Sequence, residues 1–388
     1  MEHIQHRLPW SASGTERTLT LFRFGSGSRK AYIQASLHAD ELPGMRVAVE
    51  LKQRLLELEA QGRLTGVIEL VPMANPIGIA QMFQGTHQGR FEFSSGKNFN
   101  RDFPALVDAV AQLLEGRLGN DADANIALIR RAMADALAAM PAPDSELDGL
   151  RRLLLQHACD ADVVLDLHCD FESIMLLYAM PQHWPRLQSL AARLGAGVTL
   201  LAEDAGGSAF DEACAIAWLR LAERFPAANI PLACVATTIE LRGMADTERE
   251  QCVDSAQAIL GYLADQGLIS GDWPAAPPSH CQAMPFAGAQ YACAPHPGVV
   301  SFLQPLGAQV KVGDPLFEVI DPLAARRVRR RHHHPRRGDR RARRRPHRRR
   351  VSRTPARRSG RGGHGDGRAR HGRSRAPRRC SQTALARR

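Results

Sequence analysis

Two residues near the N-terminus have the types and spacing of metal ligands. His38 and Glu41 follow an apolar run over residues 31–37 and precede a helix-like stretch that begins near Pro43. Proline suits a first helical turn, so both side chains are expected where a strand ends and a helix begins, the edge at which open α/β sheets bind ligands. An imidazole and a carboxylate three residues apart can reach one ion, and a catalytic zinc typically takes three protein ligands. The pair alone is common by chance, so a third ligand is required.

His168 supplies that third candidate, because it ends the clearest buried-strand pattern of the chain, residues 161–168. Asp166 lies two residues earlier and therefore on the same face of the strand. Its carboxylate could orient an imidazole from behind or accept a backbone N–H, and the pattern leaves both roles open. Cys169 points to the opposite face and is interpreted as a packing residue.

A carboxylate, Glu240, lies near the end of another apolar and β-branched segment, residues 232–243. A charged group in such a segment needs a partner or a function. A surface pair with Arg242 would be the preferred interpretation if the chain had no metal ligands elsewhere.

The polar loop at residues 85–104 is too long and too rich in Gly for a simple connection, and long loops of this kind are usually functional or disordered. Its four Phe residues argue against disorder. Arg101 has a forked donor that suits a carboxylate, although a solvated surface Arg is the alternative.

Four motifs in chain order resemble those of the succinylglutamate desuccinylase/aspartoacylase family, a deacylase branch of the zinc-carboxypeptidase-like fold. They are His38-x-x-Glu41, Asn100-Arg101, Asp166-Leu167-His168 and Thr238-Ile239-Glu240. The resemblance covers roughly residues 30–320, and its specificity comes from the joint order of the motifs. Family members often have Gly where this chain has Ala39, and Asp40 adds a negative charge beside the expected metal.

The resemblance implies one Zn²⁺ per chain, bound by His38, Glu41 and His168. It also implies that Glu240 is the general base, which takes a proton from the metal-activated water and passes it to the leaving amine. Zinc lowers the pKa of its water towards ~7 and polarises a substrate carbonyl.

The resemblance further implies that Asn100 and Arg101 bind the carboxylate of the substrate. Family members use another cation to stabilise the developing oxyanion, a contribution of ~3 kcal/mol in comparable sites. Arg90 is the first candidate for this catalytic role and Lys97 the second, because loop spacing varies.

Strand and helix patterns alternate along the chain, which predicts a largely parallel α/β sheet. The strands are expected at residues 18–24, 31–37, 66–72, 161–168, 173–180, 198–202 and 232–243. Helices are expected at 43–61, within 105–158, and at 211–225 and 248–266. Together with the resemblance, this order predicts a three-layer α/β/α zinc-carboxypeptidase-like domain with a mixed sheet, followed by a small β module.

The expected domain organisation has four parts. Residues 1–270 form the zinc hydrolase domain, 271–279 a linker by their Pro and Gly content, 280–325 a truncated β module, and 326–388 an Arg-rich tail. The module resembles half of a lipoyl- or biotinyl-type hammerhead. No Lys occupies a plausible attachment turn, so no covalent cofactor is expected.

The net charge of +11 arises from this tail, which contains more than half of the 51 basic residues, no Lys and only two Asp. The preceding residues are net acidic. The tail could be a non-specific nucleic-acid arm. Its Arg, Gly, Pro, Ala and His composition without Lys is also typical of GC-rich DNA read out of frame, so a disordered or frameshift-derived tail is the preferred hypothesis.

The remaining composition predicts a cytoplasmic protein. No apolar run approaches the ~20 residues of a membrane helix, the first residues lack the apolar core of a signal peptide, and the 8 Cys are scattered without a dense framework. No membrane or specific nucleic-acid partner is expected.

The functional hypothesis is a zinc-dependent hydrolase that cleaves the amide C–N bond of an N-acyl amino acid or a related N-acyl amine. A metallocarboxypeptidase is the alternative enzyme, and a nucleic-acid-binding protein acting through its tail is the alternative of another class. The sequence leaves the acyl group, the amine and a homo-oligomeric state undetermined.

Overall fold

The computed structural model describes residues 1–323, 329–333 and 384–385. The chain divides into two compact units, the first comprising Met1–Gln290 and Ala384–Arg388 and the second Tyr291–Thr383. The two are described separately below.

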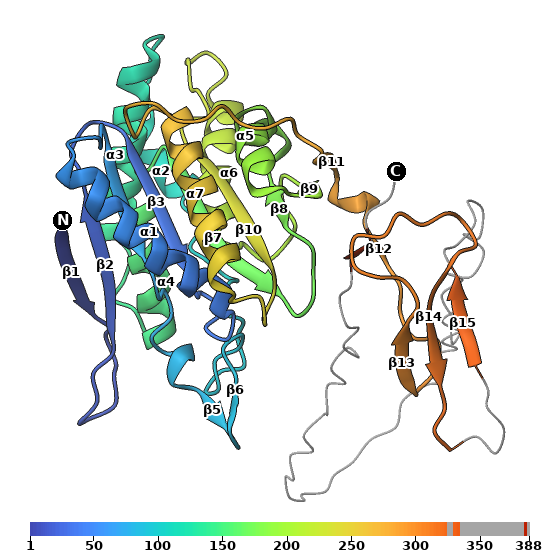
Figure 1. The fold of residues 1–388 in the computed structure, drawn as a ribbon. Coiled ribbons are helices and arrows are strands. Elements are labelled where there is room, and N and C mark those ends of the chain that lie inside the picture. Colours follow the sequence, from blue (N-terminus) through green and yellow to red (C-terminus); the bar gives the residue numbers. More distant parts are fainter. Residues whose placement is uncertain (324–328, 334–383, 386–388) are drawn as a thin grey trace, which may run out of the picture. The chain divides into compact units, whose positions relative to one another are not determined.

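The first unit is built on a 9-stranded mixed sheet (Figure 1). In spatial order its strands are β1 (Glu2–Arg7), β2 (Thr18–Phe24), β4 (Val67–Val71), β3 (Lys30–Ala35), β7 (Val163–Asp170), β10 (Val235–Gly243), β8 (Leu176–Ala179), β9 (Val198–Leu201) and β11 (Gln282–Pro285). The central strands β4, β3, β7 and β10 are parallel, whereas β2 and β8 run antiparallel to their neighbours β4 and β10. The carboxyl ends of β3, β7 and β10 therefore meet at one edge.

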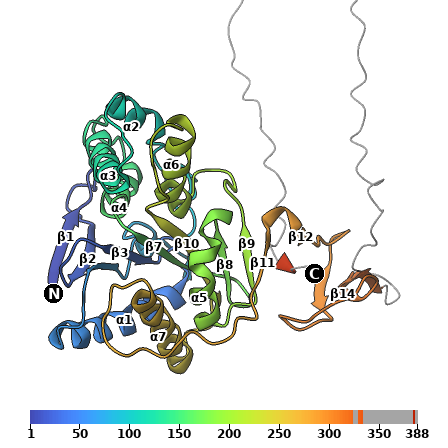
Figure 2. The same ribbon diagram turned by 90° about the horizontal axis from the view of Figure 1, so that it is seen from above.

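Helices cover both faces of this sheet (Figure 2). One layer contains α2 (Val107–Leu114), α3 (Ala122–Ala138), α4 (Glu146–Ala158) and α6 (Phe210–Arg224), and the other contains α1 (Leu42–Ala60), α5 (Trp184–Leu194) and α7 (Arg249–Asp265). Each layer has its own buried apolar cluster. The expected α/β/α fold class with a mixed sheet and a small β module is confirmed.

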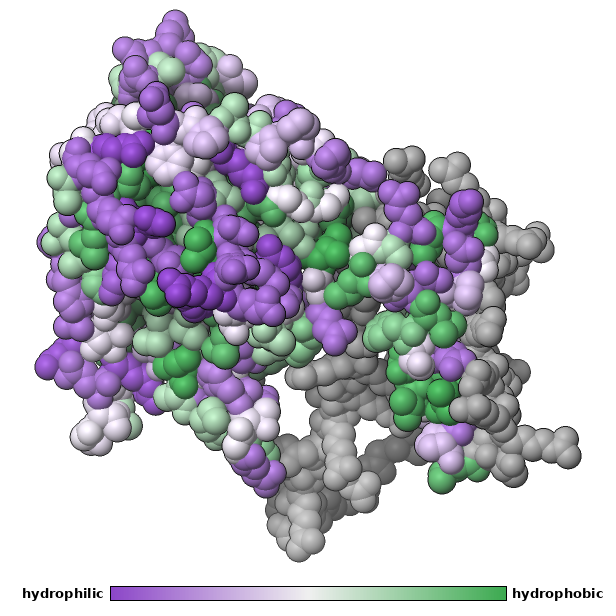
Figure 3. Space-filling view, in the orientation of Figure 1, coloured by the Kyte–Doolittle hydropathy of each residue, from purple (hydrophilic) through white to green (hydrophobic). Residues whose placement is uncertain are grey.

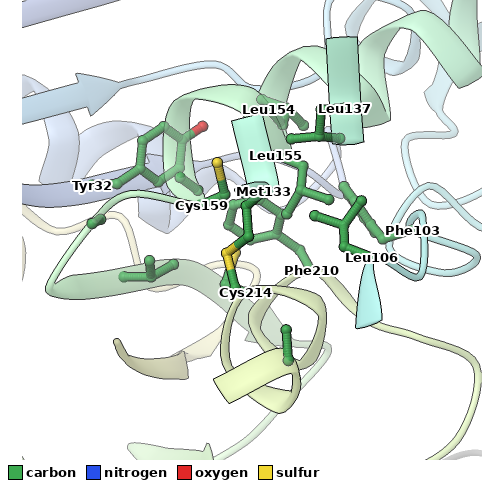
Figure 4. Close-up of a cluster of buried hydrophobic side chains, with 14 of the residues drawn as sticks. Tyr32, Phe103, Leu106, Met133, Leu137, Leu154, Leu155, Cys159, Phe210 and Cys214 are labelled. Atoms are coloured by element: carbon green, nitrogen blue, oxygen red, sulfur yellow. The ribbon is translucent and has the colours of Figure 1, made fainter. Parts of the chain in front are cut away.

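The strands alternate between the two apolar clusters, as a period of two requires. Tyr32 and Val164 face the cluster beneath α2, α3, α4 and α6, whereas Ile33 and Leu165 face the opposite one. Figure 4 shows part of the first cluster, in which Tyr32 lies near Phe210 and the residues of α3 and α4. This alternation fixes which side chains of β3, β7 and β10 share a face.

The second unit contains a three-stranded antiparallel sheet of β13 (Val299–Phe302), β14 (Pro315–Ile320) and β15 (Arg329–His333). Hydrophobic side chains gather on its surface near β13 and β14 (Figure 3), and Val299 and Phe302 are exposed. The strand β15 lies in the segment that was expected to be a tail. Most of residues 326–388, with the frameshift and nucleic-acid hypotheses, lie outside the described residues.

Among the elements not anticipated from the sequence are β1 and α5, and the position of β11 was not anticipated either. Residues 280–325 were expected to form the β module, but β11 pairs with β9 at the edge of the main sheet and the first unit extends to Gln290. A four-residue strand carries no periodicity that identifies its sheet. The remaining short elements are β5 (Met82–Phe83), β6 (Thr86–His87), β12 (Gln290–Tyr291), β16 (Ala384–Leu385), η1 (Gly78–Ala80), η2 (Pro181–His183) and η3 (Phe286–Gly288).

No helix among the described residues combines the length and the apolar character needed to cross a bilayer.

A buried charge cluster connects β2, β3 and β4 to α4. Glu69 is fully buried, and its carboxylate accepts from Arg23 Nη2 at 2.6 Å and lies 3.2 Å from Lys30 Nζ and 3.1 Å from His157 Nδ1. Burial alone would raise the pKa of Glu69, but the hydrogen bonds from His157 and Arg23 and the charge of Lys30 outweigh it and lower the pKa to about 2. His157 therefore belongs to a structural network.

Replacement of Glu69 by Gln should destabilise the first unit by about 3 kcal/mol at pH 7, because the lowered pKa corresponds to that much differential stabilisation. A carboxylate with a depressed pKa contributes stability above its ordinary pKa of 4.5 and loses it as the pH falls towards about 2. The difference between wild type and Glu69→Gln should therefore shrink between pH 5 and pH 2. Urea unfolding across this range measures it.

Glu57→Gln is the matched control, because Glu57 makes an exposed pair with Arg54 and such pairs contribute ~1 kcal/mol or less. A Glu69→Gln midpoint equal to that of the control at pH 7 would contradict the prediction.

Candidate active site

The candidate site lies where β3, β7 and β10 end side by side. His38 follows β3, Glu41 is the N-cap residue of α1, and His168 lies in β7. In the parallel pairing of β10 with β7, Glu240 is opposite His168 and Thr238 is opposite Asp166. Three segments that are distant in the sequence thus deliver side chains to one edge of the sheet, as open α/β sheets do at ligand sites.

The Glu41 carboxylate lies between the two imidazoles. Its Oε1 is 2.9 Å from His38 Nδ1, and its Oε2 is 2.8 Å from His168 Nδ1. All three residues are buried, and their ligand atoms lie within 4.8 Å of one another. Among the described residues, this is the one group of three or more His, Cys, Asp or Glu side chains that could hold a metal ion.

The outer nitrogen of His38, which is the Nε2 that points away from Glu41, contacts Asn98 Oδ1 at 2.8 Å. The same oxygen accepts the backbone N–H of Asn100 at 2.8 Å, which identifies it as the acceptor end of the amide. His38 Nε2 must therefore carry the hydrogen, and the lone pair of Nδ1 is left for a metal. Asn98 was not singled out from the sequence.

His168 is oriented in the same way by Asp166, whose Oδ2 lies 2.9 Å from His168 Nε2. The other oxygen of Asp166 accepts from Gln34 Nε2 at 2.9 Å, and Gln34 Oε1 accepts from the Tyr32 hydroxyl at 3.0 Å. The orienting role, one of the two left open for Asp166, is the one that the geometry shows. Gln34 extends this chain and was missed because nothing in its local sequence distinguishes it.

The charges of the site favour the metal-binding protonation state at Glu41 and His38, whereas at His168 they favour the protonated imidazole, which must lose a proton before it can bind a metal. Burial would raise the pKa of Glu41, but the two histidines outweigh it and hold the pKa well below its usual range. Burial lowers the pKa of His38, which favours the neutral imidazole. Burial also opposes a charge on His168, yet Asp166 and Glu41 together raise its pKa.

The donor set fits zinc. Two imidazoles and one carboxylate form a common set of catalytic zinc ligands, and the outer nitrogens of both imidazoles have oxygen partners, as zinc-bound histidines usually do. His38, Glu41 and His168 would hold the ion.

Glu240 is half-buried on β10, and its Oε2 is buried without a hydrogen-bond partner in the described part of the chain. Burial and the nearby charge of Glu41 raise the pKa of Glu240 to about 8, although His168 opposes this shift. A carboxylate of raised pKa, next to the candidate metal ligands in the sheet, has the property expected of a general base near neutral pH.

The polar loop brings some of its expected residues to the site. Arg90 Nη2 donates to Glu41 Oε1 at 2.8 Å, and the buried Asn100 places its Nδ2 3.3 Å from His168 Nε2. Arg101 is exposed and donates to the backbone oxygen of Asn100 at 2.6 Å. Lys97 is also exposed, and its backbone N–H donates to Ser95 Oγ. Arg90, rather than Lys97, is thus the cation that contacts a candidate ligand.

The chain is similar to proteins of one enzyme family. Residues 28–124 match the family model of the succinylglutamate desuccinylase/aspartoacylase catalytic domain. A crystal structure of a protein of this family from Shewanella amazonensis is 28% identical, with a TM-score of 0.74, and the match covers 85% of this chain and 91% of that one. The resemblance to the succinylglutamate desuccinylase/aspartoacylase family is confirmed.

Two further structures support the fold. A family protein from Shewanella frigidimarina is 24% identical with a TM-score of 0.74, covering 84% of this chain and 90% of that one. A succinylglutamate desuccinylase from a Silicibacter species is 18% identical with a TM-score of 0.58, covering 86% of both chains. No curated protein matches the sequence significantly. The family matches support a deacylase enzyme.

The backbone of the polar loop, residues 85–104, closely approaches the backbone of the loop that carries His38. Gly89 O accepts the backbone N–H of Ala39 at 3.0 Å, and a Cβ added to Gly89 would lie 2.0 Å from Asp40 N. Such a clash is with backbone and cannot be relieved by a side-chain rotation. Gly89 therefore permits the contact between the two loops that carry His38 and Arg90.

Gly89→Ala should displace the His38 loop, destabilise the unit by about 1–3 kcal/mol and weaken zinc binding. Gly119→Ala is the matched control, because a Cβ there meets nothing within 4 Å. Chelator competition and urea unfolding provide the two measurements. Equal zinc affinity in both variants would show that the contact at Gly89 does not position the ligands.

Proposed function

We propose that this protein is a zinc-dependent deacylase that hydrolyses the amide bond of an N-acyl amino acid or a related N-acyl amine. The observation that carries the proposal is the convergence of His38, Glu41 and His168 with the Glu240 carboxylate at the same edge of the sheet, where Glu240 Oε2 has no hydrogen-bond partner among the described residues. The family matches support the deacylase class.

A bound zinc would supply Lewis-acid polarisation of the scissile carbonyl and acidify a water at its open coordination position. Glu240 would take the proton of that water on its carboxylate and deliver it to the amine nitrogen as the C–N bond breaks. Burial raises the pKa of Glu240 to about 8. A pKa this close to neutral pH allows one carboxyl group to act first as a base and then as an acid.

Arg90 would place its guanidinium beside the developing oxyanion, since it already lies against Glu41 at the centre of the site. Asn100 and Arg101 would bind the substrate carboxylate. The exposed guanidinium of Arg101 donates to the backbone oxygen of Asn100 and makes no other hydrogen bond or ion pair within the described part of the chain, so donors of its fork are available to a ligand.

The purified protein should release amino acid from N-acetyl- or N-succinyl-amino acids and should lose this activity when zinc is removed by a chelator, because the three ligands lack their ion. Added Zn²⁺ should restore it. An amine-release assay over a panel of acyl-amino acids and blocked dipeptides makes the measurement. Hydrolysis of blocked dipeptides alone would favour a metallocarboxypeptidase, and activity that persists without metal would contradict the proposal.

Glu240→Gln should lower kcat by about 10³-fold, since the amide cannot accept the proton and general acid–base groups contribute on the order of 10²–10⁴. Zinc content should stay unchanged, because Glu240 is not one of the proposed ligands. Glu223→Gln, an exposed carboxylate on α6 paired with Arg220, is the control and should keep wild-type kcat. Turnover that survives in Glu240→Gln would assign the base to another residue.

A further inference from the structure

Arg151 is a buried cation with no assigned role. It lies on α4, its side chain is 5% exposed, and its helical neighbours Leu147, Leu150 and Leu154 belong to the apolar core. Burying a guanidinium is unfavourable unless its donors are paired. The partners of its guanidinium therefore indicate the role of Arg151.

The hydrogen bond and the ion pair of Arg151 both go to the loop that carries the candidate site residues. Its Nη2 donates to the backbone oxygen of Asn98 at 2.9 Å and lies 3.8 Å from the Asp102 carboxylate. These two residues flank Asn100 and Arg101. This one guanidinium nitrogen thus contacts both ends of the segment, whereas the buried Arg151 Nε has no hydrogen-bond partner in the described part of the chain.

Asn98 in turn determines which nitrogen of His38 faces the metal position. While its backbone oxygen is bound by Arg151, its side-chain oxygen accepts from His38 Nε2 and from the backbone N–H of Asn100. A shift of the Asn98 backbone would move this oxygen away from the imidazole. The hydrogen on Nε2 would then lose its acceptor, and Nδ1 would no longer be held in its ligating form.

We infer that Arg151 is a positioning residue that fixes the Asn98 backbone so that His38 presents Nδ1 to the metal. This inference rests on the proposed function for the identity of the metal, but the link from Arg151 through Asn98 to His38 exists in the metal-free protein.

The neighbouring Arg152 shows what a purely structural Arg on the same helix does. Its guanidinium bonds Asp148 one turn earlier and the backbone oxygen of Pro141. Neither partner belongs to the site loop. Arg152→Met is therefore a matched control for the loss of a partly buried guanidinium from α4.

Three variants test the inference: Arg151→Met, Asn98→Ala and the double variant. The first readout is the ¹⁵N signal of the His38 imidazole in the metal-free protein, which reports its tautomer and hydrogen bond. The second is the zinc affinity from chelator competition. Arg151→Met should alter the His38 signal and weaken zinc affinity about 10-fold, as loss of a partner behind a metal ligand typically does. Arg152→Met should leave the His38 signal unchanged and the zinc affinity within about 2-fold of wild type.

The double variant separates positioning from general stability. In the Asn98→Ala background, Arg151→Met should weaken zinc by less than about 2-fold further, because the link to His38 is already cut and coupled residues are non-additive. The inference would be overturned if the fold-losses of zinc affinity in the two single variants simply multiplied in the double variant. Equal zinc affinities in Arg151→Met and Arg152→Met would also overturn it.

Asn98→Ala keeps the test decisive if Arg151→Met does not fold. It leaves the backbone acceptor of Arg151 in place and removes the contact with His38, so an unchanged His38 signal in this variant overturns the inference. A wild-type protein that binds no zinc would contradict the proposed function instead, while the metal-free ¹⁵N signals would still decide the role of Arg151.

Discussion

The site depends on one carboxylate held between two imidazoles. Glu41 contacts Nδ1 of both His38 and His168, and it also accepts the backbone N–H of Cys169 at 3.0 Å. Three buried polar side chains in such proximity are unfavourable unless each is fully satisfied. The surrounding loops and strands are arranged so that the outward-facing nitrogens have oxygen partners as well.

The alternation of the strands explains how this arrangement is built. On β3, β7 and β10 the even-numbered residues face α4 and α6, which places Gln34, Asp166, His168 and Thr238 on one side of the sheet. Apolar residues at the odd positions pack against α1 and α7 on the other side. A single backbone register therefore positions both the core and the site, and a one-residue slip would exchange them.

The sequence was sufficient to predict the parts that a strand end or a strand face encodes. His38, His168 and Glu240 end apolar segments, and Asp166 shares the face of His168 by spacing alone. Asn98, Gln34 and Arg151 could not be predicted in this way, because their roles depend on which loop or strand packs beside them. For the same reason, the sequence of the short strand β11 did not predict which sheet it joins, because its pairing with β9 depends on tertiary contacts.

A second buried carboxylate shows why similar residues give a structural cluster in one place and a candidate metal centre in another. Glu69, like Glu41, is buried with histidine and arginine partners and has a lowered pKa. At Glu69 two permanent cations, Arg23 and Lys30, contact the carboxylate, whereas at Glu41 Arg90 is the one such cation among the described residues.

At Glu41 the two principal partners are imidazoles, and the hydrogen of each outer nitrogen is directed to Asn98 or Asp166. The inner nitrogens then face a carboxylate, and three acceptors that converge with their lone pairs inward are stabilised by a cation at their centre. The difference between the two clusters is thus made by the residues behind the histidines. If Arg151 positions Asn98 as proposed, it contributes to the candidate metal centre although it touches none of the three ligands.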